Sequence, residues 1–267
     1  MTDIGGPGLS VPNRLGVAAR IHDGELWLQL EPRPQTLHLG IVRASVLSFM
    51  IDAVAGISVD EDPDVWTLTT DMTVRMRPLP APSCVIARNR VLRRGRRSST
   101  CMVELTTPQG SPVCAGAIGF ANIPRKASDP PKPMFSAEHA AQFMPGVASL
   151  SQPLRDEAGI EVVDAVAGVV EVDLTPELRN PAGTLQGAMV ALVAEAAAEE
   201  FVAARLDSPV VVVDLDLRYL AQTKEGPVRT VCRSLGSTPD APVQVELIDT
   251  STGQLTTLVY ARAQKVS

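Results

Sequence analysis

Most of the chain alternates apolar and polar positions with a period of two, which is the pattern of half-buried β-strands. Two segments depart from this pattern, because they are apolar on nearly every face through several helical turns. These segments, Arg43–Ile57 and Gln186–Leu206, predict two helices that are buried on all sides. In each half of the chain the helix follows a strand hairpin and precedes a run of strands, which predicts an α+β fold with an antiparallel sheet.

The predicted strands occur in the same order in both halves, and turn residues separate them. In the first half they are Val17–Arg20, Leu26–Leu30, Trp66–Met76, Cys84–Arg93, Thr100–Leu105 and Val113–Ala121. In the second half they are Ile160–Val163, Val169–Leu174, Val210–Leu220, Val228–Leu235, Val243–Asp249 and Leu255–Ala263. A long helix wrapped by such a sheet is the hotdog shape, so each half predicts one hotdog unit.

The two halves also match in sequence at a spacing of about 143 residues. The matching pairs are Gly16 and Gly159, Gly40 and Gly183, Asp71 and Asp214, Arg75 and Arg218, and Gly110 and Gly253. Chance would not hold one register over this length, so the pattern indicates a tandem duplication. We expect a double hotdog with repeats at residues 1–125 and 147–267. The linker at 126–146 is rich in Pro and Lys and ends in a short predicted helix, Ser136–Met144.

Each long helix carries one acidic residue in its apolar interior, Asp52 in the first and Glu195 in the second, and the two are repeat equivalents. An unpaired buried carboxylate costs on the order of several kcal/mol, so each must be paired, protonated or in reach of water. Asp52 is therefore either part of a buried ion pair with an arginine of the other repeat or a catalytic carboxylate. Glu199 and Glu200 lie nearer the end of the second helix, and we expect them to be solvated.

The loop before the second helix, NPAGTLQGA, begins at Asn180. Asn180 offers an uncharged donor and acceptor, and Gly183 permits a tight turn. Gly187 stands where the helix begins, so its N–H is one of the unpaired donors of the first turn. The helix dipole adds partial positive charge at this point, where an oxyanion could form. The loop is thus either an ordinary strand-to-helix connection or half of an active site.

This loop, followed by Glu195, resembles the N-x-x-G-x-x-H-G-G-x6-[DE] signature of hotdog acyl-CoA thioesterases of the phenylacetyl-CoA and 4-hydroxybenzoyl-CoA type. Gln186 replaces the usual His, and Ala188 replaces the second Gly. In the first repeat only Gly40 and Asp52 keep the signature. The resemblance covers both repeats and implies an enzyme of lipid metabolism that hydrolyses an acyl-CoA thioester to a free acid and CoA.

In that family the helix N-terminus of one unit meets the carboxylate of the other. By resemblance, the first site takes Asn180, Gln186 and Gly187 from the second repeat, and Asp52 and Thr69 from the first. The Gly187 N–H would polarise the thioester carbonyl, and Asp52 would act as nucleophile or as general base on water. Asn180 would hold the water or the thioester, and Thr69 would position the carboxylate or the water. No metal is implied, and no cofactor beyond the coenzyme A of the substrate.

The equivalent second site would combine Leu37, Arg43 and Ala44 with Glu195 and Val212. It lacks both the amide and the hydroxyl group of the first site. We expect it to be inactive, with Arg43 neutralising Glu195.

Eight arginines gather between positions 75 and 97 of this otherwise acidic chain, whose formal net charge is −6. The net charge and the scarcity of aromatic residues argue against a nucleic-acid partner. The run LRRGRRSS predicts a hairpin turn. It is either a solvated turn or an anchor for the CoA phosphates, since arginine forks match phosphate geometry. The residues of this anchor would be Arg93, Arg94, Arg96 and Arg97.

The cysteines carry no metal or disulfide pattern. Cys84, Cys101, Cys114 and Cys232 are widely spaced, without a CxxC pair, which favours reduced thiols in a cytoplasm. The N-terminal segment lacks the basic and apolar regions of a signal peptide, and no apolar run approaches the length of a membrane span. The sequence thus predicts a cytoplasmic protein without a membrane partner, and it leaves room for a homo-oligomer of the double hotdog.

Three other interpretations stay open. A hotdog enoyl-CoA hydratase would need an Asp and a His in a G-D-x-N-P-x-H-like loop, and none of the three histidines stands in one. A non-catalytic acyl-CoA sensor would keep the pocket and lose the chemistry. The other group of double-hotdog thioesterases uses an Asp, a Thr or Ser, and a Gln, which Asp52, Thr69 and Gln186 could supply without changing the reaction. The expected acyl-chain lining is Met50, Val54, Met72 and Met189.

Overall fold

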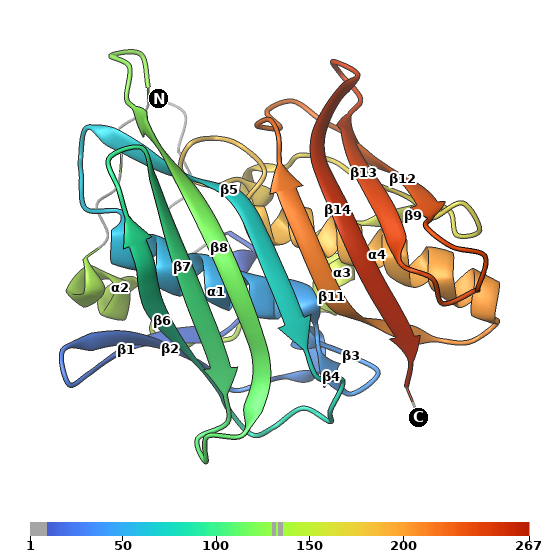
Figure 1. Cartoon of the computed structure of the whole chain (residues 1–267), viewed down its shortest axis with the longest axis horizontal. Helices are drawn as coiled ribbons and strands as arrows, with labels where there is room; N and C mark the ends of the chain where they lie inside the picture. Colours follow the sequence, from blue (N-terminus) through green and yellow to red (C-terminus); the bar gives the residue numbers. More distant parts are fainter. Residues whose placement is uncertain (1–9, 130–131, 133–135, 267) are drawn as a thin grey trace.

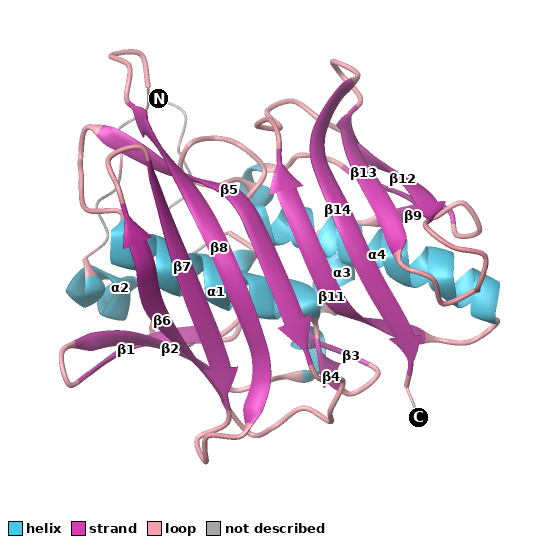
Figure 2. Ribbon diagram, in the orientation of Figure 1, coloured by secondary structure: helices cyan, strands magenta, loops and turns pink. Residues whose placement is uncertain are grey.

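The computed structural model describes residues 10–129, 132 and 136–266. Over these residues, a twelve-stranded antiparallel sheet curves around two long helices (Figure 1; Figure 2). The strands of the first half are β1 (Val17–His22), β2 (Glu25–Leu30), β5 (Val65–Met76), β6 (Val85–Arg94), β7 (Ser98–Thr106) and β8 (Pro112–Pro124). Those of the second half are β9 (Glu161–Asp164), β10 (Val169–Val172), β11 (Val210–Tyr219), β12 (Val228–Ser234), β13 (Val243–Asp249) and β14 (Gln254–Lys265). Each strand predicted from the alternation is present.

The strand order is β1-β2-β6-β7-β8-β5-β11-β14-β13-β12-β10-β9. Each half contributes six neighbouring strands, and the second half repeats the arrangement of the first in reverse. The long helices, α1 (Ala44–Val59) and α4 (Gly187–Leu206), contact each other and the sheet. They are apolar on nearly every face because the sheet and the partner helix together enclose them. This confirms the predicted α+β architecture with one wrapped helix in each half.

The two halves meet where β5 pairs with β11. Arg75 lies opposite Asp214, and Asp71 lies opposite Arg218. These four residues are the repeat-equivalent pairs of the sequence, so an approximate twofold axis runs through the centre of this strand pair. The Arg75 guanidinium also donates to the Leu215 carbonyl (2.9 Å), which ties the two strands together.

Beyond this central stretch β5 and β11 separate at both ends. The first residues of β5 pair only with β8, and Tyr219 at the end of β11 pairs with β14. Each strand has a register irregularity at the equivalent place, between Thr69 and Asp71 in β5 and between Val212 and Asp214 in β11. The fold therefore brings together residues of both repeats at two related but unequal places.

Shorter elements complete the fold. They are the hairpin β3 (Leu37–His38) and β4 (Ile41–Val42), the helices α2 (Ala137–Phe143) and α3 (Leu154–Glu157), and the 3-10 turns η1 (Pro12–Arg14), η2 (Pro34–Thr36) and η3 (Pro176–Leu178). Helix α2 confirms the short helix predicted in the linker, where the Ser136 hydroxyl caps it by accepting from the His139 N–H (3.2 Å). The Pro- and Lys-rich part of the linker lies partly outside the described residues.

The β3–β4 hairpin, which the alternation did not predict, stands just before α1. The His38 Nε2 atom lies 3.0 Å from the carbonyl oxygen of Val210, so the hairpin is fastened to the start of β11. Within the described segments, no helix combines the length and the hydropathy needed to cross a lipid bilayer. The four cysteines are free thiols.

Candidate active site

The carboxylate of Asp52 is held by both repeats. Thr69 on β5 donates its hydroxyl to Asp52 Oδ1 (2.8 Å), and the side-chain amide of Gln186 donates to Asp52 Oδ2 (3.3 Å). Asp52 and Thr69 come from the first repeat, whereas Gln186 comes from the second. The structure thus assembles the Asp, Thr and Gln that the sequence offered as one set of catalytic side chains.

The orientation of the Gln186 amide is fixed by the start of α4. Gln186 is the N-cap of this helix, and its Oε1 accepts from the N–H groups of Ala188 (2.7 Å) and Met189 (3.2 Å). With the oxygen used in this way, the NH2 group faces Asp52. One side chain therefore caps the helix of its own repeat and holds the carboxylate of the other.

Gly187 follows the cap and is the first residue of α4. Its N–H donates to none of the described residues, as expected for the first turn of a helix. A Cβ built on Gly187 would lie 3.4 Å from Asp52 Oδ2 and 3.5 Å from the Tyr219 hydroxyl oxygen. The absence of a side chain at this position therefore lets the Asp52 carboxylate and the Tyr219 hydroxyl lie close to the helix N-terminus with no methyl group between them.

Tyr219 is a site residue that the sequence did not reveal. It is the last residue of β11, and its hydroxyl donates to the Gly187 carbonyl oxygen (3.1 Å). Its repeat equivalent is Met76, which carries no hydrogen-bonding group of this kind. The sequence did contain a signal for it. Tyr219 has a polar hydroxyl where the equivalent residue of the first repeat is an apolar methionine, and such a difference marks a place where the two repeats have diverged.

Burial changes the titration of the two oxygen acids in the site. Burial raises the pKa of Asp52, and the hydrogen bond from Thr69 acts in the opposite direction. Burial raises the pKa of Tyr219 well above its ordinary value, and the charge of Asp52 adds to this effect. Asp52 is therefore a stronger proton acceptor than an ordinary aspartate once it is ionised, whereas the tyrosine stays protonated.

Asn180 does not join this group. Its Oδ1 accepts from the N–H groups of Ala182 (3.0 Å) and Thr184 (3.1 Å), which closes the turn before α4. None of the described hydrogen bonds of Asn180 reaches Asp52 or Gly187. The structure thus brings together four of the five predicted catalytic residues, and gives Asn180 a place in the supporting loop.

The equivalent place in the other half is closed. The Glu195 carboxylate, 1% exposed, accepts from the N–H groups of Ala44 (2.8 Å) and Ser45 (3.3 Å) and from the Ser45 hydroxyl (2.5 Å). The first-turn donors of α1 are therefore occupied by an acid of the other repeat. Val212, buried on β11, stands where the first site has Thr69, and Leu37 lies on β3.

Arg43 has a nearer partner than the one expected for it. Its guanidinium donates to Glu199 Oε2 (3.1 Å) and lies 3.8 Å from Glu195. The expectation that Glu199 is solvated is wrong, because it is 4% exposed and packed between the two repeats. Burial and the charge of Glu195 raise the pKa of Glu199 to about 8. At neutral pH Glu199 therefore holds a proton, and one ionised carboxylate, that of Glu195, faces the single positive charge of Arg43. Glu200 is half-buried and paired with Arg155 (2.6 Å), so it too is not simply solvated.

The length of the acidic side chain accounts for the difference between the two places. Glu195 has one more methylene than Asp52 and reaches the Ala44 N–H directly. The shorter Asp52 is held to one side by Thr69 and Gln186, and the Gly187 N–H stays available. The structure thus supports the unequal sites expected from the sequence, with the open one at α4.

The arginines of the 75–97 stretch do not form one cluster. Arg75 lies in the β5–β11 pair, and Arg88 stacks on Trp27 with 3.9 Å from guanidinium carbon to ring centre. In the β6–β7 turn, Arg94 pairs with Glu61 and donates to the Ser58 carbonyl (2.7 Å).

The other turn arginines differ in how they are engaged. Arg93 donates to the Ser98 hydroxyl (3.2 Å). Arg96 and Arg97 are exposed, and their side chains make no described hydrogen bond or ion pair. Of the four predicted phosphate ligands, these two are best placed to meet a ligand.

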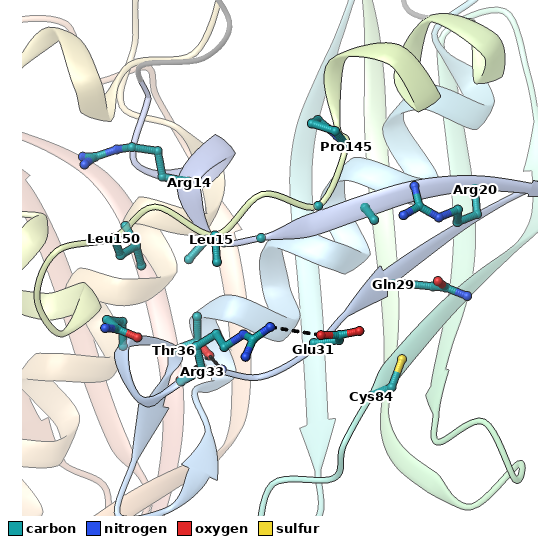
Figure 3. Close-up of a pocket in the computed structure, with 15 residues that line it drawn as sticks. Arg14, Leu15, Arg20, Gln29, Glu31, Arg33, Thr36, Cys84, Pro145 and Leu150 are labelled. Atoms are coloured by element: carbon teal, nitrogen blue, oxygen red, sulfur yellow. Dashed lines mark hydrogen bonds and ion pairs between the residues drawn. The ribbon is translucent and has the colours of Figure 1, made fainter.

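A cavity of about 400 Å³ lies elsewhere, between β1, β2 and the segment that follows α2 (Figure 3). Neither Asp52 nor Gln186 lines it. Three of its charged residues are paired, since Arg33 bonds Glu31 (3.1 Å) and Arg14 bonds Glu157 (2.5 Å), whereas the Arg20 guanidinium donates to the Ala19 carbonyl (2.9 Å). The expected acyl lining is also not exposed in this structure, because the four residues concerned are buried in the core: Met50, Val54, Met72 and Met189.

No protein-family model matches the sequence, and no curated protein matches it. Solved structures match it over nearly the whole chain. The tesB protein of Mycobacterium avium subspecies paratuberculosis has a TM-score of 0.63 at 14% identity, covering 96% of this chain and 98% of its own. A conserved protein with a hotdog fold from Alicyclobacillus acidocaldarius has a TM-score of 0.57 at 13% identity, covering 96% and 98%.

The 12:0-ACP thioesterase of Umbellularia californica has a TM-score of 0.59 at 11% identity, covering 93% of this chain and 97% of its own. At these identities the likeness concerns the fold. Together with the strand order and the repeated helices, it shows that the chain is a double hotdog.

Proposed function

We propose that this protein is a thioesterase that hydrolyses an acyl thioester at a single site between its two repeats. The observation that carries the proposal is the Asp52 carboxylate, held by Thr69 and Gln186 beside the unpaired N–H of Gly187. A general base and an oxyanion donor thus stand next to each other, as acyl transfer to water requires. The solved structures of similar fold include proteins described as thioesterases, among them the 12:0-ACP thioesterase, which supports this reaction class.

The reaction follows from these groups. The Gly187 N–H, at the positive end of the α4 dipole, binds the thioester carbonyl oxygen. Asp52 removes a proton from water, whose oxygen bonds to the carbonyl carbon and forms a tetrahedral oxyanion. When this intermediate collapses, the carbon–sulfur bond breaks and the thiolate leaves. The thiolate takes the proton from Asp52, so the products are a carboxylic acid and a free thiol.

We propose coenzyme A as the thiol, because the β6–β7 turn lies near Thr69 across the paired strands β8 and β7. Thr69 pairs with Phe120 of β8, and Phe120 pairs with Ser99 of β7. Arg97 precedes Ser99 by two residues, so its backbone lies roughly 10 Å from Thr69 across the strands and roughly 7 Å from it along them. An extended pantetheine arm and an arginine side chain can bridge this distance. The CoA phosphates would then meet Arg96 and Arg97.

A non-catalytic acyl-CoA sensor is the competing function, and a thiol-release assay separates the two. We expect the wild-type protein to release free thiol from at least one member of a panel of acyl-CoAs that varies in chain length. Asp52→Asn should bind that acyl-CoA in isothermal titration and release thiol at least about 10²-fold more slowly than the wild type. Binding by the wild-type protein without thiol release from any member would favour the sensor.

A further inference from the structure

The buried ion pair of the closed place, Arg43 with Glu199, has no counterpart in the open place. There the Glu199 carboxylate of α4 accepts from the guanidinium of Arg43, which is the N-cap of α1 (3.1 Å). The repeat spacing relates Arg43 to Gln186, which is the N-cap of α4. It relates Glu199 to Gly56 of α1, and each of these two residues stands one helical turn after the acid of its helix. The open place therefore has neither charge of this ion pair.

The face of α1 that carries Asp52 is accessible to solvent, unlike the equivalent face of α4. In the closed place Glu195 and Glu199 are 1% and 4% exposed. Their equivalents in the open place, Asp52 and Gly56, are both partly exposed. The absence of a side chain at Gly56 thus coincides with the place where solvent reaches this face of the helix.

The backbone of Gly56 is not closely covered by other side chains. Among the described residues, and leaving aside its own helix backbone, a Cβ on Gly56 would have one neighbour within 4 Å, the Phe120 ring carbon Cε1 at 3.9 Å. This is an ordinary van der Waals distance, so the packing of Phe120 does not require a glycine. A glycine inside a helix lowers its stability relative to alanine. Without a packing reason, the glycine is explained by a ligand that approaches this turn of α1.

Gly56 lies between Asp52 and the proposed phosphate anchor. Two residues further along α1, the carbonyl oxygen of Ser58 accepts from Arg94 in the β6–β7 turn (2.7 Å). Asp52 and Ser58 are six residues apart, which is about 9 Å along the helix. The same turn carries the two arginines proposed to meet the CoA phosphates. A chain that runs along α1 from Asp52 to this turn therefore crosses Gly56.

We propose that Gly56 is a specificity-determining residue, over which the pantetheine arm of the thioester reaches Asp52. The inference rests on the proposed function and assigns one side of the site to the thiol. The missing side chain lets the uncharged arm lie against the backbone of α1. In the closed place Arg43 and Glu199 occupy the equivalent route, so no arm reaches Glu195. The acyl group then extends from the carbonyl carbon away from Gly56.

Gly56→Leu tests the inference through the binding of free CoA in isothermal titration, which does not depend on hydrolysis. We expect the dissociation constant to rise about 10- to 100-fold, because the added side chain overlaps the space of the arm. In the thiol-release assay, KM should rise by the same factor for every acyl-CoA of the panel, since all share one arm. Gly56→Ala adds a methyl group with an ordinary contact, so it should melt no lower than the wild type and raise both constants at least about twofold.

Ala203→Leu is the matched control. Ala203 is partly exposed on α4, and it lies sixteen residues beyond Gly187, which is about 24 Å along the helix. The same kind of enlargement at this distance from the site should leave CoA binding and KM as in the wild type.

Unchanged CoA binding and unchanged KM in the Gly56 variants would overturn the inference. A rise in KM that grows with the length of the acyl chain would also overturn it, because the acyl group would then be the part that crosses Gly56. If Gly56→Leu does not fold, Gly56→Ala decides between these outcomes. An Asp52→Asn variant that releases thiol as fast as the wild type would instead overturn the proposed function, whatever the Gly56 variants do.

Discussion

Replacing Asp52 by Glu tests why only one of the two helix N-termini is open. At the closed place Glu195 reaches the Ala44 N–H at 2.8 Å and removes it as a donor. Asp52 is shorter by one carbon–carbon bond, about 1.5 Å. Its Oδ2 lies 3.4 Å from the position of a Cβ on Gly187. An added methylene would bring the carboxylate onto the Gly187 N–H, as Glu195 is on the Ala44 N–H.

Asp52→Glu keeps the negative charge, so a loss of activity would come from geometry. Removing one oxyanion donor costs about 10²- to 10³-fold in kcat, which is about 2.7–4 kcal/mol. We expect at least this loss in a thiol-release assay at saturating acyl-CoA, with a melting temperature near that of the wild type. A variant that keeps more than about a tenth of the wild-type kcat would refute the argument from side-chain length.

Glu195→Asp is the matched control in the other half. Shortening this side chain should withdraw it from the buried Ala44 N–H, and an unpaired buried donor costs about 1–3 kcal/mol of stability. The expected result is therefore a lower free energy of unfolding in urea with an unchanged kcat. If Glu195→Asp lost activity and kept its stability, the working site would lie at α1.

Three further outcomes are expected. Asp52→Asn should lower kcat about 10²- to 10⁴-fold, and it should raise the melting temperature at neutral pH. The reason is that burial raises the pKa of Asp52, so the ionised form destabilises the folded state; an unchanged or lower melting temperature would argue against this. Glu199→Gln should gain stability relative to the wild type as the pH rises from the ordinary glutamate value of 4.5 toward about 8, because the folded protein holds a proton there that the unfolded chain has lost. Melting curves across this window would show parallel wild-type and variant stabilities if the assignment were wrong. The double change of Arg96 and Arg97 to Ala should raise KM for acyl-CoA roughly fivefold. It should leave KM unchanged for the matching acyl-N-acetylcysteamine, which has no phosphates. An equal rise in KM for both substrates would show that these two residues do not bind the phosphates.

The sequence was a good guide to the elements, because each depends on a local pattern. Alternation located the strands, and the two wholly apolar segments located α1 and α4 within a few residues. The β3–β4 hairpin was not predicted, because strands of two residues are too short to show an alternation of apolar and polar positions. The burial of Glu199 was not predicted either, because its position near the end of the helix gives no information about Arg43, which packs against it from the other repeat.

The sequence predicted only part of the candidate site, because several of its contacts join residues that are far apart along the chain. Asp52 and Glu195 stood out because an acid in an apolar helix is costly, and the repeat related them to each other. Asn180 fitted a motif, but its amide is used by its own turn. Tyr219 belonged to no motif, because its role comes from lying beside Gly187, thirty-two positions away along the chain.

The sequence by itself determined the duplication, the order of strands and helices in each half, and the acid within each helix. Periodicity and residue identity are properties of the chain, and they can be seen before it folds. Only the tertiary structure decided which acid meets which helix N-terminus, and whether that N-terminus is open. That outcome depends on a length difference of one methylene between Asp52 and Glu195, measured against donors from the opposite repeat. Such a comparison exists only after the two repeats have packed around their approximate twofold axis.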